Sequence, residues 1–173
     1  MLMPLLALPL LIPQREEPSV KIEDLVTVIN QAQKERKRVL LRFESKICAD
    51  SQVLRNLVKR RKVAKILGDE YVQLGIEVGA LDQNMNIAEA FQAPLVEVGT
   101  PFLVVLDFGE IIATASASQL KNEKTGVLDR GKFLAFLEEH RVPPPVALDV
   151  LEEARSRAAK EGKNLFVHIG APW

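Results

Sequence analysis

Helical and strand-like stretches of apolar residues alternate along the first 141 residues. Ile22, Leu25, Val26 and Ile29 recur at the spacing of one helix face, which predicts an amphipathic helix from Val20 to about Lys34. Further on, the pattern predicts a strand at 39–43, a helix after Cys48 that bends or breaks near a basic cluster and ends at Gly68, a strand at 71–78, a short helix at 87–91, a hairpin at 102–114 and a helix at 129–141. Long crossovers make the first two strands parallel and the hairpin is antiparallel, so we expect an α/β fold with a mixed sheet.

The sequence after residue 141 repeats the opening of the chain. Residues 142–146 are rich in proline and predict a linker. Placing Lys34-Glu35 over Lys160-Glu161 gives an offset of 126 positions (160 minus 34), and strand residues 39–41 then match 165–167. Residues 147–173 are therefore expected to form the first helix and strand of a second, truncated unit. The strand at 165–169 would lack its own sheet, so we expect it to be poorly ordered or to pair with an edge of the first unit.

With this offset, Ile47 matches Trp173. The residue that matches Cys48 in the repeat would be the one directly after Trp173. We therefore expect the chain to be a fragment of a longer protein. A reading frame that continues past the Trp173 codon would support this expectation, and a stop codon there would remove it.

The segment at 1–19 reads as an export signal followed by a polar spacer. Met1 to Pro13 is Leu-rich and uncharged, too short to span a bilayer but long enough for the apolar part of a signal peptide. No Lys or Arg precedes it and no clear cleavage site follows it, so a mis-set start codon or a disordered tail stays open. We expect a periplasmic or extracellular protein, and otherwise a cytoplasmic one.

Composition narrows the range of partners. The 23 basic and 23 acidic side chains balance, and the basic clusters 34–38 and 59–62 are interpreted as solvated helix ends, so no nucleic-acid partner is expected. His140 and His168 lie too far apart to suggest a metal site, and no glycine-rich loop suggests a cofactor. The single cysteine, Cys48, excludes a disulfide within this chain.

Cys48 follows a predicted strand and a short loop, at the start of a predicted helix. The free N–H groups and the dipole at a helix start stabilise an anion, and the thiolate is the reactive form of cysteine. The alternative is that Cys48 is a small buried apolar residue without reactivity.

Several motifs together resemble the thioredoxin-like superfamily. Phe43 stands five residues ahead of Cys48, Gly99-Thr100-Pro101 precedes a strand-like run, and Gly170-Ala171-Pro172-Trp173 resembles the lead-in to a Trp-Cys-x-x-Cys site. The resemblance implies a three-layer α/β/α sandwich and thiol–disulfide exchange with protein thiols or disulfides, or with a low-molecular-weight thiol. It also implies a cis-proline at Pro101, with Thr100 and Pro101 presenting backbone to an extended substrate.

The sequence departs from that family at the site itself. In Cys48-Ala49-Asp50-Ser51 a serine takes the place of the second cysteine, which resolves the mixed disulfide in that family. Any adduct on Cys48 must therefore be resolved by a thiol from elsewhere. We expect that thiol in the second unit. Ile47 replaces a tryptophan, and Asp50 adds a negative charge that opposes thiolate formation. Arg42 stands where the family has a buried carboxylate. The candidate catalytic residues are thus Cys48 and Ser51, and the alternative function is an inactive binding or scaffold module.

Overall fold

The computed structural model describes residues 20–168. The chain divides into two compact units, Met1–Arg141 and Val142–Trp173. This boundary coincides with the start of the predicted proline-rich linker. The expected signal segment at residues 1–19 lies outside the described residues.

A four-stranded mixed sheet forms the centre of the first unit. Its strands are β1 (Arg38–Glu44), β2 (Tyr71–Glu77), β3 (Phe102–Asp107) and β4 (Glu110–Ser116), in the order β2-β1-β3-β4. Strands β1 and β2 are parallel, whereas β3 is antiparallel to both β1 and β4. The predicted parallel pair and the predicted hairpin are confirmed.

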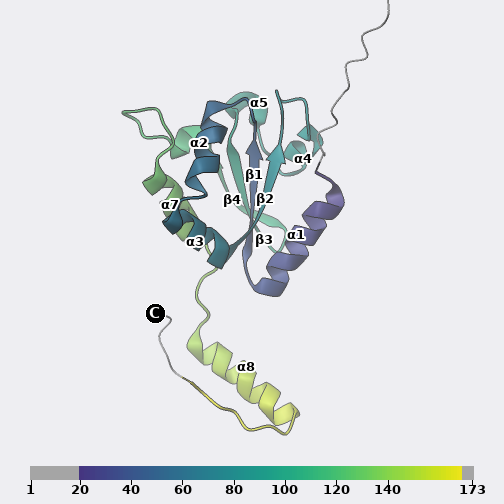
Figure 1. Ribbon diagram of the computed structural model, residues 1–173. Helices are drawn as coiled ribbons and strands as arrows, with labels where there is room; N and C mark the ends of the chain where they lie inside the picture. The colour runs from purple at the N-terminus through teal and green to yellow at the C-terminus, as the bar shows by residue number, and fades with distance from the viewer. Residues whose placement is uncertain (1–19, 169–173) are drawn as a thin grey trace, which may run out of the picture. The chain divides into compact units, whose positions relative to one another are not determined.

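Helices cover both faces of this sheet and complete a three-layer α/β/α arrangement (Figure 1). In the described part of the first unit they are α1 (Ile22–Glu35), α2 (Ala49–Leu57), α3 (Arg61–Glu70), α4 (Met85–Ala90), α5 (Leu95–Val98), α6 (Ala117–Leu120) and α7 (Arg130–Glu139). Helices α1, α4 and α5 contribute to the core on one face, while α2, α3, α6 and α7 contribute to the core on the other.

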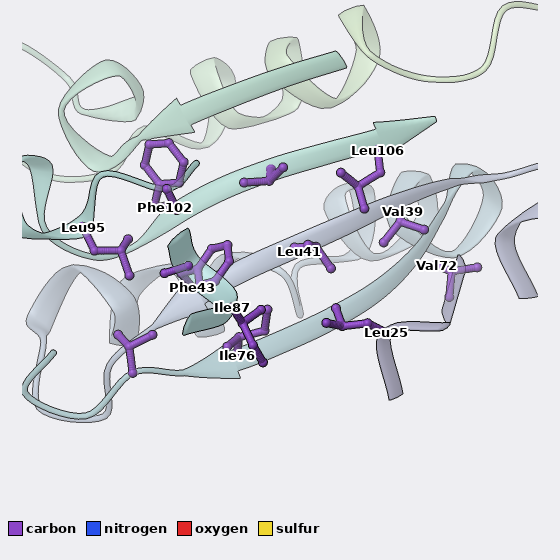
Figure 2. Close-up of a cluster of buried hydrophobic side chains, with 14 of the residues drawn as sticks. Leu25, Val39, Leu41, Phe43, Val72, Ile76, Ile87, Leu95, Phe102 and Leu106 are labelled. Atoms are coloured by element: carbon purple, nitrogen blue, oxygen red, sulfur yellow. The ribbon is translucent and has the colours of Figure 1, made fainter. Parts of the chain in front are cut away.

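The central strands are buried on both faces, which explains their almost unbroken apolar sequence. Side chains alternate across a strand, so Val39, Leu41 and Phe43 of β1 enter one core while Leu40 enters the other. Figure 2 shows the first core, where the labelled side chains of β1, β2 and β3 meet Leu25 of α1 and Ile87 of α4. The loop that leaves β1 therefore starts from a strand held on both faces.

The helix predicted after Cys48 is broken, as expected, but its second part continues beyond Gly68. Helix α3 ends at Glu70 because Val63, Ile66 and Leu67 are buried in the second core, and this packing outweighs the low helix propensity of glycine. The break also corrects the interpretation of the basic cluster. Arg61 and Lys62 lie in the first turn of α3, where the helix dipole opposes cations.

In the second unit, α8 (Ala147–Lys160) forms where the repeat predicts a helix. Residues 163–168 form no strand. The described part of this unit contains the helix α8 and no strand, so a strand there would lack a partner within the unit for its backbone hydrogen bonds. Residue 169, the end of the predicted strand, lies outside the described residues.

Candidate active site at Cys48

Cys48 is the N-cap of α2, and its position follows from how β1 ends. The loop of residues 45–47 joins Glu44 to Cys48, whose backbone is extended (φ −88°, ψ 126°). The amide of Cys48 donates to the carbonyl oxygen of Ser45 at 3.2 Å, and its carbonyl accepts from the amide of Gln52 at 3.1 Å. The half-buried thiol therefore lies at a helix start, as predicted.

The fold brings Thr100 and Pro101 to this thiol. The Sγ atom of Cys48 donates to the carbonyl oxygen of Thr100, 3.2 Å away, although the two residues are 52 positions apart. The peptide bond between Thr100 and Pro101 is cis. Pro101 is buried and Thr100 is half-buried, at the entrance to β3. Three of the four candidate site residues thus meet at one point.

Ser51, the fourth candidate, is fully buried in α2 and contacts the loop of residues 45–47, called here the thiol loop. Its Oγ accepts a hydrogen bond from the amide of Ser45 at 3.1 Å. Because a hydroxyl has one proton and that proton is not used in this bond, Ser51 can donate to Cys48 at the same time. Ser51 therefore links the residue after β1 to the thiol of Cys48, a role that differs from that of a resolving thiol.

Hydrogen bonding outweighs burial in setting the acidity of Cys48. Burial raises the pKa of the thiol, whereas hydrogen bonds from the side chains of Thr100 and Ser51 and from the amides of Ser51 and Asp50 lower it. The contact with the Thr100 carbonyl favours the neutral thiol, but the donors prevail. The pKa of Cys48 lies below its ordinary value, so the thiolate is favoured.

An ion pair offsets the negative charge of Asp50. Its Oδ2 atom lies 2.6 Å from Nζ of Lys121, which follows α6. The expectation that Asp50 opposes thiolate formation is therefore incomplete, because the sequence alone does not place Lys121 against it.

A buried carboxylate is present near the site, on a residue that the sequence analysis did not select. Glu44 is only 6% exposed and forms ion pairs with Arg42 at 2.8 Å and with Arg55 at 3.2 Å. Arg55 also donates to the carbonyl of Ser45 at 3.4 Å. Residues 42 and 44 share one face of β1 by strand alternation, so the Arg42–Glu44 pair is readable from the sequence. The contacts of Arg55 depend on the packing of α2.

Ser45 is a further residue that the sequence analysis did not select. Its side chain donates to the carbonyl of Gly79 at 2.6 Å, which ties the thiol loop to the segment after β2. Glycine is favoured at position 79, since φ is +57° and an added Cβ would lie 2.3 Å from Oδ1 of Asp82.

Within residues 20–168, no group of three or more His, Cys, Asp or Glu side chains is placed to hold a metal ion. None of the helices described between these limits is long and apolar enough to cross a bilayer.

The comparisons with known proteins identify the fold. No family model and no curated protein sequence matches the chain. Among solved structures, a disulfide isomerase from Xylella fastidiosa Temecula1 is similar with a TM-score of 0.60 and 20% identity, over 68% of this chain and 88% of that one.

Two thioredoxins are also similar in structure. Deadhead, the germline-specific thioredoxin of Drosophila melanogaster, has a TM-score of 0.52 and 19% identity, over 72% of this chain and 99% of its own. A thioredoxin from Thermus thermophilus has a TM-score of 0.50 and 20% identity, over 83% and 94% of the two chains. The chain therefore has a thioredoxin-like fold, as the sequence motifs predicted.

Proposed function

We propose that the protein carries out thiol–disulfide exchange with Cys48 as a single nucleophilic thiol. The observation that carries the proposal is the placement of an acidic thiol at the start of α2, in contact with Thr100 beside Pro101. The thioredoxin-like fold and its likeness to a disulfide isomerase and to thioredoxins support the same class of reaction.

The proposed reaction begins with attack by the Cys48 thiolate on one sulfur of a substrate disulfide. A new S–S bond joins Cys48 to the substrate, the old S–S bond breaks, and the second substrate sulfur leaves as a thiolate that takes a proton from water. Since Ser51 cannot act as a sulfur nucleophile, release requires another thiol. As a thiolate, that group attacks the substrate sulfur of the adduct and forms a new S–S bond with it, while the bond to Cys48 breaks and the Cys48 thiolate is released. The resolving thiol can come from the substrate, a low-molecular-weight compound or a second protein unit.

Residues around the thiol suit an extended polypeptide as the substrate. We propose that the backbone at Thr100 and Pro101 pairs with the substrate chain in the manner of an added strand. Exposed apolar residues lie close in sequence to Cys48 and Thr100. Ile47 is 79% exposed, Val96 on α5 is 75% exposed, and Val98 is 39% exposed. These side chains favour a substrate cysteine that lies among apolar residues.

The pH dependence of alkylation tests this function. Cys48 is the chain's single cysteine, so reaction with iodoacetamide reports on one thiol. An apparent pKa well below about 8.5, the value of a free cysteine, supports exchange. An apparent pKa at or above this value would instead support the alternative, a thioredoxin-like module that binds polypeptides without redox chemistry. The serine at position 51 is the observation that favours the alternative.

We also propose that residues 147–173 begin a second thioredoxin-like unit. Shifting α1 by the repeat offset of 126 places a helix at residues 148–161, and α8 spans Ala147–Lys160. A dithiol in such a unit would supply the resolving thiol.

Export to the periplasm or the extracellular space fits the proposed chemistry, because protein disulfides persist in oxidising compartments. The apolar segment Met1 to Pro13 supports this location. Cell fractionation of the full chain tests it, and retention of the unprocessed chain in the cytoplasm would contradict it.

A further inference from the structure

An ion pair lies in the first turn of the helix that carries the thiol. Asp50 follows Cys48 by two residues, and its carboxylate is the nearest to Cys48 along the sequence. The Oδ2 atom of Asp50 is 2.6 Å from Nζ of Lys121, with the two side chains 27% and 32% exposed. The ion pair is therefore partly shielded from solvent.

The backbone around Lys121 is held by contacts other than the ion pair. Lys121 forms an antiparallel bridge with Leu128, and the neighbouring Leu120 and Leu128 side chains are buried in the second core. Asn122 closes the intervening loop. Its amide donates to the carbonyl of Val127 at 2.9 Å, and its side-chain oxygen accepts from the amide of Lys124 at 2.9 Å. Little conformational freedom of the backbone remains to be lost when Lys121 pairs with Asp50.

The charge of Asp50 matters because the same helix start stabilises the thiolate. An unpaired carboxylate in this turn would compete with the thiolate for the positive end of the helix dipole, and it would repel the thiolate directly. A cation within ion-pair distance cancels most of that repulsion.

The other charged groups on the elements around the thiol do not replace this effect. Glu44, at the end of β1, is paired with Arg42 and Arg55. The carboxylate of Glu77, at the end of β2, accepts hydrogen bonds from the amides of Lys46 at 2.9 Å and Gly79 at 3.2 Å. Glu97, on α5, is exposed to solvent, which screens its charge.

We propose that Lys121 is a positioning residue for Cys48, which acts by neutralising Asp50 in the first turn of α2. The inference rests on the proposed nucleophilic role of Cys48. In this proposal, the loop between α6 and α7 positions the Lys121 ammonium group next to the first turn of α2.

A charge cycle on the full chain tests the proposal. The rate of iodoacetamide alkylation is measured across pH for the wild type, Lys121→Met, Asp50→Asn and the double variant. Lys121→Met unmasks Asp50, so it should raise the apparent pKa of Cys48 and slow alkylation below that pKa by about two- to fivefold. Asp50→Asn leaves a free cation near the thiol and should react at least as fast as the wild type. The double variant should return to the wild-type rate.

Two further variants separate charge from structure. Lys121→Arg keeps the cation and should keep the wild-type pH profile. Lys65→Met removes an exposed lysine that pairs with Asp69 at 2.7 Å on α3, and it should leave the profile unchanged. If Lys121→Met fails to fold, Lys121→Gln takes its place in the cycle.

The proposal is overturned if Lys121→Met reacts like the wild type, or if the double variant is as slow as Lys121→Met. These outcomes are independent of the proposed function. Iodoacetamide reads the ionisation of Cys48 whether or not the protein attacks a disulfide, whereas a wild-type thiol with an ordinary pKa would contradict the proposed function itself.

Discussion

The hydroxyl of Ser51 performs two tasks at the residue scale. It accepts the hydrogen bond of the Ser45 amide at 3.1 Å, inside the protein, and it donates toward the thiolate of Cys48. A serine at this position is thus consistent with a reactive thiol, although it removes the second sulfur. Its effects on stability and on reactivity can be measured separately.

Replacing Ser51 with alanine is expected to weaken the fold and the nucleophile together. The amide of Ser45 would lose its buried acceptor, which costs about 1–3 kcal/mol of unfolding free energy. The pKa of Cys48 should rise because the thiolate loses a donor. Urea unfolding and the pH profile of alkylation measure the two effects. Ser156→Ala, at an exposed serine on α8, is the control. An unchanged alkylation profile in Ser51→Ala would contradict the assigned role.

The lowered pKa of Cys48 also predicts a pH dependence of stability. The folded state favours the thiolate more than the unfolded state does, so unfolding takes up a proton between the two pKa values. The contribution of Cys48 is fully present above the ordinary cysteine pKa and is lost as pH falls through the lower folded value. The difference in unfolding free energy between the wild type and Cys48→Ala should therefore increase with pH across this window. A difference that falls with rising pH would contradict the lowered pKa.

The sequence locates the main residues of the site but not the charges that surround them. Order and spacing were sufficient to select Cys48, Thr100 and Pro101, and the fold places these residues together. Lys121 could not be predicted, because its contact with Asp50 depends on how the loop after α6 packs against α2. The side-chain contacts of Arg55 depend in the same way on tertiary packing.

At the scale of elements, the apolar periodicity of the sequence predicts the helices and strands that are long enough to show a repeating pattern. The four strands and the longer helices appear close to their expected positions. Helices α5 and α6 have four residues each, about one turn, which is too short to show a repeating apolar face. The hairpin turn was marked by Gly109, where φ is +92°, although Phe108 before it also adopts a positive φ of 48°.

Tyr71 connects two elements that the sequence pattern treats separately. Its hydroxyl, at the start of β2, donates to the carbonyl of Leu137 in the last turn of α7 at 2.6 Å. This carbonyl is among the last four of the helix, which have no partner within the helix. Tyr71→Phe should therefore lower the unfolding free energy by about 1–3 kcal/mol while keeping the ring packed. Urea denaturation measures this effect, and an unchanged midpoint with an unchanged slope would show that the bond contributes nothing.

At the scale of the whole molecule, both hydrophobic cores belong to the first unit. Every buried residue of the two clusters lies between Leu25 and Leu137. In the second unit, α8 has no buried residue. The first unit should therefore fold without the second.

A chain that ends at Arg141 provides the test. Its thermal midpoint and the alkylation rate of its Cys48 should match those of the full chain, because neither the cores nor the thiol contacts involve residues beyond 141. Near-ultraviolet circular dichroism and mass spectrometry are suitable measurements. A fall of more than several degrees in the midpoint, or slower alkylation, would show that the second unit supports the first.

The most direct test of the account is the intact mass of the native chain after exposure to oxidised glutathione. We predict one glutathione adduct per chain, which persists when excess reagent is removed and is released by dithiothreitol. In Ser51→Cys, the new thiol should instead attack the adduct on Cys48, release glutathione and form an intrachain disulfide between positions 48 and 51. A native wild-type chain that forms no adduct, under conditions in which the urea-unfolded chain does, would contradict the claim that Cys48 is an exchange nucleophile.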